Sequence, residues 1–302
     1  MATANIKDVK RRIKSVESTM QITKAMELVA SSKLRRAKEK ALQSQPYFNT
    51  LYKTLTDISS NTSFPLQNGK TAEKRALLVV IAGDRGLAGG FNHNVLKLAA
   101  ERIKSITDDG FEISVMPIGK KSVEYFSKHK YDIYDQFSQV AEKMSVYDCL
   151  KISDEVVSRY TRGEFSRVEI CYTTFANTLS QIPKSVQAFP LEAKPDADSV
   201  SDDPADSDSE KKPKYKPAVV YDPSPQEVLK LLLPKYFGGL LYGAVVDSYA
   251  CEQAARRTAM ESASDNAQEM IDNLSLLYNR ARQAQITQEL TEIVSGSMKK
   301  SD

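Results

Sequence analysis

Two segments at opposite ends of the chain lack the residues that interrupt a helix. The first proline is Pro46 and the first glycine is Gly69, and neither residue type occurs between Ala244 and Ser295. At roughly 1.5 Å per residue, these stretches permit single helices of about 65 Å and about 75 Å. Helices of globular domains usually stop near about 20 residues, so these two are too long to be ordinary core helices. We expect them to pair with each other.

Apolar residues in both segments recur at alternating spacings of three and four, which is typical of a coiled-coil seam. The N-terminal positions are Ile6, Val9, Ile13, Val16 and Met20, after which the apolar face broadens to Ile22, Met26, Val29, Ala30 and Leu34. The C-terminal positions are Met260, Ala263, Ala267, Met270, Leu274, Leu277, Ala281 and Ala284. Because half of the C-terminal positions are alanine, the partner helix is expected to approach closely.

The middle of the chain has a different pattern, in which short apolar runs alternate with helical periodicity. Residues 76–82, 112–118 and 168–175 indicate buried strands, and residues 94–107, 120–130 and 146–162 indicate helices. Such alternation predicts a small parallel-type sheet. The predicted fold class is therefore α/β: a long antiparallel coiled coil of the N- and C-terminal helices plus a central Rossmann-like α/β domain. Both helices are expected to leave the domain on the same side, as a shaft on a globular foot.

We divide the chain into five segments. They are an N-terminal coiled-coil helix (1–60), the central α/β domain (75–190), a flexible acidic loop (191–217), a return segment of the foot (218–243) and a C-terminal coiled-coil helix (244–302). The loop is assigned from composition, because residues 196–210 hold seven acidic residues and no basic one. A segment so poor in large apolar side chains cannot offset its ordering entropy. No role is assigned to residues 195–212, and a merely solvated loop is the alternative.

The sequence GDRGLAGGFN, residues 83–92, follows an apolar run and precedes a helical pattern, which is where α/β proteins bind phosphate. Its spacing fits neither common phosphate motif. A dinucleotide fold needs GxGxxG and a P-loop needs GxxxxGK[ST], whereas no lysine occurs between Arg75 and Lys97. We interpret the glycines as a tight strand-to-helix turn, with Asn92 or Asn94 as the helix cap.

No combination of residues in the sequence points to catalysis. The two histidines, His93 and His129, and the three cysteines lie far apart, without a CxxC pair. Neither GxSxG nor HExxH occurs. We predict no catalytic residue, no cofactor and no metal.

The net charge of +3 is unevenly distributed, since residues 1–45 contain eleven Lys/Arg and four Asp/Glu. A basic arm fits nucleic acid, anionic lipid, an acidic protein surface or a solvated helix face, and charge does not choose among them. A coiled-coil protein that binds nucleic acid or a scaffold through this arm is therefore an alternative function. The first aromatic residue is Tyr47, so the arm lacks the aromatic interleaving that favours nucleic acid.

Membrane and export signals are weak. No run reaches the roughly 18 consecutive apolar residues of a membrane span, and the N-terminus lacks the apolar core of a signal peptide. We expect a cytoplasmic chain without a transmembrane segment of its own.

Three stretches resemble the gamma subunit of the F-type rotary ATP synthase. They are IKDVKRRIKSVESTMQITKAMELVASSKLRRA (6–37), GDRGLAGGFN (83–92) and DNAQEMIDNLSLLYNRARQAQITQELTEIVSG (265–296). The resemblance covers nearly the whole chain, although Ala88 stands where the family usually has cysteine and the acidic loop is not part of the common pattern. It implies a non-catalytic, central-stalk rotor subunit that couples proton flow to ATP synthesis. Because no transit peptide is evident, we expect a bacterial member at the cytoplasmic face of the plasma membrane.

The resemblance also implies partners: a ring of three alpha and three beta subunits around the shaft, with the epsilon subunit and the c-subunit ring at the foot. Met26, Arg282 and Gln283 are expected to contact the beta subunits, with coiled-coil packing as the alternative for Met26. Tyr221 and Asp222 match the segment that meets the c ring. Apolar residues of the last turns should sit in a sleeve of the ring, because the N-terminal helix is too short to cover them: Ile286, Leu290, Ile293, Val294 and Met298.

Overall fold

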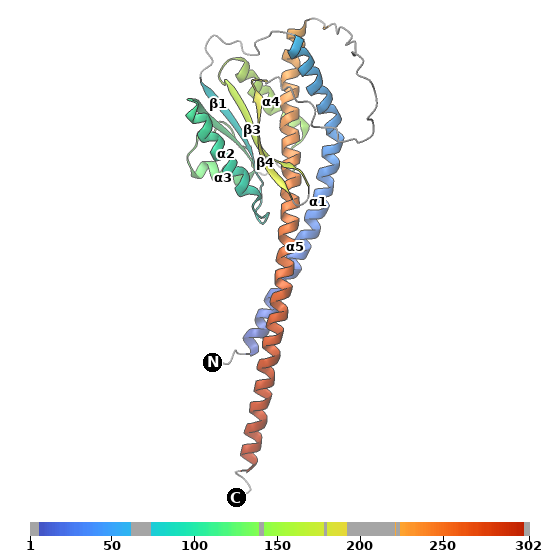
Figure 1. Ribbon diagram of the computed structural model, residues 1–302, viewed down its shortest axis with the longest axis vertical. Helices are drawn as coiled ribbons and strands as arrows, with labels where there is room; N and C mark the ends of the chain where they lie inside the picture. Colours follow the sequence, from blue (N-terminus) through green and yellow to red (C-terminus); the bar gives the residue numbers. More distant parts are fainter. Residues whose placement is uncertain are drawn as a thin grey trace, which may run out of the picture. The chain divides into compact units, whose positions relative to one another are not determined.

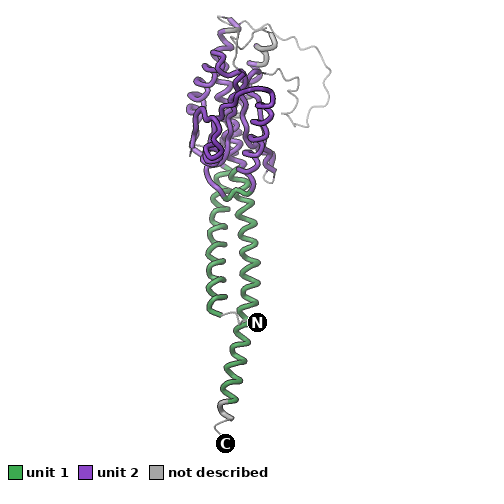
Figure 2. Tube along the Cα trace, turned by 90° about the vertical axis from the view of Figure 1, so that its left-hand side faces the viewer, with its two compact units in different colours: residues 1–35, 87–89, 252–302 green, residues 36–86, 90–251 purple. Residues whose placement is uncertain are grey.

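The computed structural model describes residues 6–61, 74–138, 142–177, 180–191, 221 and 224–298. The chain divides into two compact units (Figure 2). Unit 1 comprises residues 1–35, 87–89 and 252–302, and unit 2 comprises residues 36–86 and 90–251. Two long helices, α1 (Ile6–Asn61) and α5 (Pro225–Met298), contribute to both units.

In unit 1, α1 and α5 lie side by side and run in opposite directions, as Figure 2 shows. The predicted antiparallel pairing of the terminal helices is thereby confirmed. The first predicted seam positions of α1 lie on its covered face, with Val9 buried and Ile13, Val16 and Met20 half-buried. The α1 seam then continues at the same three-four spacing through Thr23.

Two residues of the broadened apolar face predicted for α1 do not lie on its covered side. The side chains of Ile22 and Val29 are 60% and 55% exposed, whereas Thr23 and Ala30 are buried. Thr23 escaped the apolar count because it is polar, yet its hydroxyl has a partner across the seam. The spacing of the seam therefore persists where the hydrophobicity of the sequence breaks.

The predicted seam of α5 is correct at its first three positions and at alternate positions after them. Met260 and Ala267 are buried, and Ala263, Leu274 and Ala281 are half-buried, but Met270, Leu277 and Ala284 are exposed. Ile271 and Tyr278, which are half-buried, take the places of the first two. Both sets of positions keep the three-four alternation, so spacing alone did not distinguish them.

Unit 2 contains a four-stranded sheet in the order β2-β1-β3-β4 (Figure 1). Its strands are β1 (Arg75–Ile81), β2 (Glu112–Ile118), β3 (Arg167–Phe175) and β4 (Gln181–Phe189). Its shorter helices are α2 (Phe91–Asp108), α3 (Lys120–Lys128) and α4 (Val146–Thr161), in agreement with the three predicted helical segments.

Alternate residues of the central strand β1 face opposite layers of the α/β sandwich. Leu77, Val79 and Ile81 join the core that contains α4 and the first half of α5. Leu78 and Val80 join the core that contains α2 and α3. Because both faces are covered, β1 is a continuous apolar run, as expected for a buried parallel strand.

The expected parallel-type sheet is corrected to a mixed one, because β4 runs antiparallel to β3. We predicted only three strands. Residues of β4 are mostly half-buried, and the strand carries Pro183 and Lys184. An edge strand tolerates a proline that a central strand would exclude, so β4 has neither the apolar run nor the composition by which the others are recognised.

Helix α5 begins at Pro225, well before Ala244, where the sequence pattern places its start. Pro234, Gly238, Gly239 and Gly243 lie in the part of the helix that precedes Ala244. A Cβ built on Gly239 would lie 2.3 Å from Cδ1 of Phe48, so the absence of a side chain here permits α1 to approach closely. Gly238, where an added Cβ would meet Leu150, and Gly239 therefore serve packing, and none of these glycines ends the helix.

Candidate functional site

The centre of the seam in unit 1 is polar. Oγ1 of Thr23 and Oγ of Ser264 lie 2.7 Å apart, and each hydroxyl also lies within hydrogen-bond distance of a carbonyl of its own helix. Met26, the predicted beta-subunit contact of α1, is half-buried one turn further along. Part of the Met26 side chain is thus available to a partner and part packs in this chain.

A buried ion pair lies on α5 within unit 1. Nη2 of Arg256 donates to Oε1 of Glu252 at 2.6 Å, and the two side chains are only 8% and 5% exposed. Gln253, between them in sequence, is also buried. Sequence reasoning missed this pair, although an i, i+4 carboxylate and guanidinium inside an apolar helical pattern is a signal that could have found it.

The last turns of α5 continue past the N-terminal end of α1 in unit 1 (Figure 2). Arg282 and Gln283, both predicted beta-subunit contacts, are exposed. The four predicted bearing residues are exposed too: Ile286 44%, Leu290 58%, Ile293 67% and Val294 55%. Four large apolar side chains within three turns of one helix are far more than the scattered apolar residues of an ordinary surface.

The predicted c-ring contact is only partly described. Tyr221 packs against a small apolar cluster that contains Leu51, Leu55, Ile58 and Leu229. Asp222 lies outside the described residues, as does the acidic stretch 195–212.

The glycine-rich turn is held by side chains that bind its own backbone. Asn92 accepts a hydrogen bond from the N–H of Gly83 at 2.8 Å and donates to the carbonyl of Arg85 at 3.2 Å. Asp84 accepts from the N–H of Lys120 at the start of α3 at 2.9 Å. The N–H groups of Gly83 and Lys120 are therefore already bonded to side chains of the turn.

The predicted cap of α2 is wrong. The N-cap is Gly90, and no side chain hydrogen-bonds as a cap there. Asn92 lies inside the first turn of α2 and ties the preceding loop instead.

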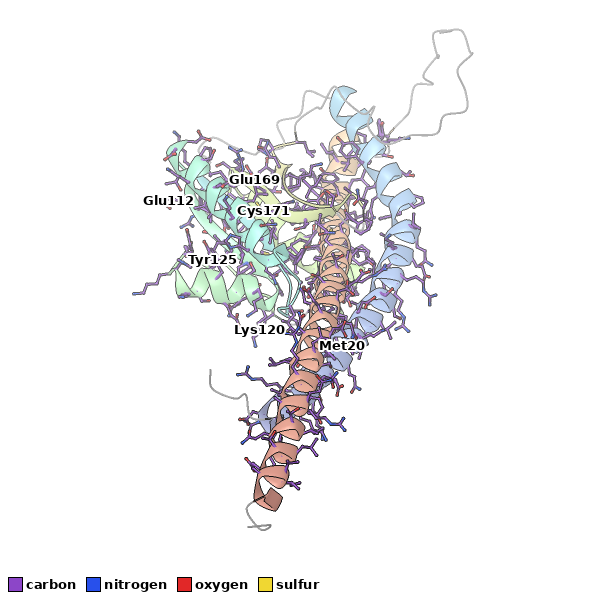
Figure 3. All side chains as sticks on the ribbon, turned by 60° about the horizontal axis from the view of Figure 1, so that its bottom comes forward. Met20, Glu112, Lys120, Tyr125, Glu169 and Cys171 are labelled. Atoms are coloured by element: carbon purple, nitrogen blue, oxygen red, sulfur yellow. The ribbon has the colours of Figure 1, made fainter. Side chains whose placement is uncertain are left out.

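A charged cluster lies on the α2 side of β3, where Figure 3 labels Glu169 and Cys171. Glu169 is 2% exposed and accepts bidentate hydrogen bonds from Arg102, with a shortest distance of 2.8 Å. Arg167 and Ser185 also donate to it, at 2.7 Å and 2.9 Å. Burial alone would raise the pKa of Glu169, but the hydrogen bonds from Arg102 and Ser185 and the charges of Arg102 and Arg167 outweigh it and lower the pKa.

The three cysteines, Cys149, Cys171 and Cys251, are all buried and reduced. Burial raises the pKa of each thiol to about 12. Thiols with so high a pKa stay protonated at neutral pH, which disfavours metal binding and thiol exchange. Within the described ranges, no group of three or more His, Cys, Asp or Glu residues is placed to hold a metal ion.

One stretch of α5, within Glu227–Ser295, is long and apolar enough to cross a membrane by length and composition alone. Half of its apolar window is buried inside the structure. Leu233, Phe237 and Leu241 belong to the core of unit 2 beside the sheet. Packing against the sheet accounts for the apolar character of this stretch.

Comparison with known proteins gives a consistent result. The family model described as ATP synthase matches residues 5–298. The ATP synthase gamma chain of Ruminococcus albus is 53% identical over 98% of each chain. The sodium-ion-specific ATP synthase gamma chain of Acetobacterium woodii is 39% identical over 97% of this chain and 98% of its own.

Solved structures share the fold at low sequence identity. A chain of the Euglena gracilis mitochondrial ATP synthase OSCP/F1/c-ring structure matches with a TM-score of 0.63 and 17% identity, over 97% of this chain and 93% of the other. A chain of the Tetrahymena thermophila mitochondrial ATP synthase central stalk and c-ring structure matches with a TM-score of 0.57 and 21% identity, over 80% and 99%.

A paired-helix unit that exposes large apolar side chains at the end of α5, together with an α/β unit, defines a structural subunit of a larger assembly. Within that class, the chain belongs to the ATP synthase gamma chain family, of the bacterial type. It is thus the non-catalytic central-stalk subunit of the rotor of an F-type ATP synthase, a membrane-associated complex.

Proposed function

We propose that this chain transmits torque between the c-subunit ring and the ring of alpha and beta subunits, at the cytoplasmic face of a bacterial plasma membrane. The observation that carries the proposal is the exposed apolar end of α5. Ile286, Leu290, Ile293 and Val294 are each at least 44% exposed in the single chain. At roughly 25 cal/mol per Å², enclosing them in a sleeve of the ring would stabilise the assembly substantially.

The contacts with the beta subunits are proposed at Met26, Arg282 and Gln283. The exposure of Arg282 and Gln283 supports this assignment, since neither side chain is consumed by packing in the chain itself. An arginine fork can hold an acidic partner at one rotational position and release it at the next. Met26, being half-buried, is proposed as a packing contact for the same subunits.

At the foot, we propose that Tyr221 and Asp222 meet the polar loops of the c ring and that the epsilon subunit binds the α/β unit. Tyr221 lies next to the chain segment that leads into α5, so a load applied there would pass directly into the longest helix. No nucleic-acid partner is proposed.

The experiment compares two apolar-to-acidic substitutions on α5 in chains co-expressed with alpha and beta subunits. Ile293→Asp changes a proposed bearing residue that is 67% exposed, and Leu231→Asp changes a residue of the same helix that is 68% exposed. We expect Ile293→Asp to release the chain from the ring about tenfold faster, while Leu231→Asp leaves release unchanged. The release rate of each variant would be measured from rings of alpha and beta subunits immobilised on a surface. Equal release rates for the two variants would contradict the assignment of Ile293 as a bearing residue.

A further inference from the structure

Unit 2 contains a cavity of about 610 Å³ that none of the rotor contacts uses. Its walls come from α1, α2, β3, β4 and α5, all within unit 2. The volume lies in the range of roughly 300 to 1,000 Å³ that is typical of pockets for small organic ligands.

One part of the lining is cationic. Arg102 and Arg167 line it, with side chains 31% and 22% exposed, and the buried carboxylate of Glu169 holds both. Two guanidinium groups against this one carboxylate leave one net positive charge on the wall. Asp109, whose Oδ2 lies 3.7 Å from Nη1 of Arg167, is 57% exposed and does not line the cavity.

Arg102 is positioned to bind an anion. Its Nε and Nη2 atoms donate to Glu169, whereas Nη1 makes no hydrogen bond among the described contacts. An arginine oriented by a buried carboxylate loses little side-chain entropy when it binds a ligand.

A second part of the lining is aromatic. Tyr52 of α1 and Tyr236 of α5 stack with ring centroids 6.2 Å apart and an interplanar angle of 29°. Phe48 and Leu240 extend this wall, and Val186 of β4 lies on the lining as well. Stacked rings beside aliphatic side chains favour a flat apolar group.

We propose that this cavity is a binding site for a small organic anion with an aromatic body. The sulfonate, carboxylate or phosphate of the ligand binds Arg102 and Arg167, and the ring system lies against Tyr52, Tyr236 and Val186. Such a ligand contacts α1, β4 and α5 at once, so it braces the α/β unit of the stalk.

The test is a titration of the purified full-length chain with 1-anilinonaphthalene-8-sulfonate, an aromatic anion whose fluorescence rises on binding. We expect one saturable site. Val186→Trp, which fills the cavity, is expected to weaken binding at least tenfold. Ile182→Trp is the matched control, because Ile182 is on the same strand, is 51% exposed and does not line the cavity.

The charge of the ligand is tested with the uncharged analogue N-phenyl-1-naphthylamine, which lacks the sulfonate and is expected to bind at least tenfold more weakly. Circular dichroism checks the fold of each variant. If Val186→Trp fails to fold, Tyr52→Ala, which removes an aromatic wall residue that is 38% exposed, carries the same expectation. Equal dye affinity in the cavity variants and in Ile182→Trp overturns the site, and equal affinity for the neutral analogue overturns its anion specificity.

Discussion

Oγ1 of Thr23 and Oγ of Ser264 approach to 2.7 Å in the middle of the paired helices of unit 1. Each hydroxyl also reaches a carbonyl one turn back in its own helix, that of Met20 or Met260. A polar pair at one seam position can fix the register of two helices, because any shift would leave a buried hydroxyl without its partner across the seam. A purely apolar seam at this position would let the two helices slide along each other, and the hydroxyl pair opposes that shift in register.

We expect Thr23 and Ser264 to be energetically coupled. In a double-mutant cycle with Thr23→Val and Ser264→Ala, the coupling in the free energy of unfolding should be about 0.5 to 1.5 kcal/mol. Thr19→Val is the control, since the hydroxyl of Thr19 is exposed and donates only to the carbonyl of Ser15. Coupling no greater than that between Thr19→Val and Ser264→Ala would show that the pair does not set the register.

Replacing Ala267 with leucine should separate the two helices. Ala267 is 6% exposed on the covered face of α5, so added methyl groups have no space. The expected loss of stability is about 1 to 3 kcal/mol. Ala284→Leu makes the same chemical change on the same helix at an exposed position and should have little effect on the melting temperature. Similar melting temperatures for both variants would mean that the helices can part without cost.

Much of this architecture follows from the sequence. The long helices are specified by long stretches without proline or glycine and by the three-four spacing, and strands β1, β2 and β3 are specified by apolar runs. The exact seam of α5 does not follow, because Met270 and Ile271 are both apolar and only packing exposes the first. Nor does the start of α5, since a glycine within a helix is recognised as a packing device only when Phe48 is seen against Gly239.

The charged cluster of unit 2 is a different case. Arg102 and Glu169 are 67 positions apart in sequence, and neither residue belongs to a motif. Their pairing depends on how α2 crosses the sheet. The proposed rotor contacts were all predicted from the family resemblance. For one group of them, the apolar residues in the last turns of α5, the spacing along the helix gives independent support.

Glu169→Gln should destabilise the chain and change its acid sensitivity. The folded state lowers the pKa of Glu169, so the stabilisation from its ionised form is complete above the unfolded pKa and is lost as the pH falls through the lower folded pKa. Removing the charge leaves Arg102 without its buried partner and Arg167 with only the exposed carboxylate of Asp109, at a cost of about 3 kcal/mol near pH 7. Urea unfolding between pH 3 and pH 7 should show a flatter pH dependence in the variant.

Asp247→Asn is the control, because the pKa of Asp247 shifts in the opposite direction to that of Glu169. Burial raises the pKa of Asp247, against the smaller lowering effects of the Thr174 hydroxyl and the Lys184 charge. The folded state therefore favours its protonated form, and stability is lost as the pH rises through the folded pKa. The asparagine variant should be at least as stable as the parent near pH 7. A loss of stability in Asp247→Asn equal to that of Glu169→Gln would contradict the assigned signs.

Arg282→Ala separates torque transmission from folding. Arg282 is exposed and follows the half-buried seam residue Ala281. Its truncation should therefore change the free energy of unfolding of the isolated chain by no more than about 0.5 kcal/mol. In assembled complexes, loss of its charged hydrogen bonds to a beta subunit should weaken the coupling of ATP hydrolysis to proton pumping or change the hydrolysis rate.

Complexes that carry Arg282→Ala, Ala267→Leu or no substitution would be compared for subunit yield, ATPase rate and proton pumping. We expect Ala267→Leu to lower subunit yield and Arg282→Ala to spare yield while altering coupling. If both variants lowered the yield equally, Arg282 would be a structural residue and the proposed torque contact would be wrong.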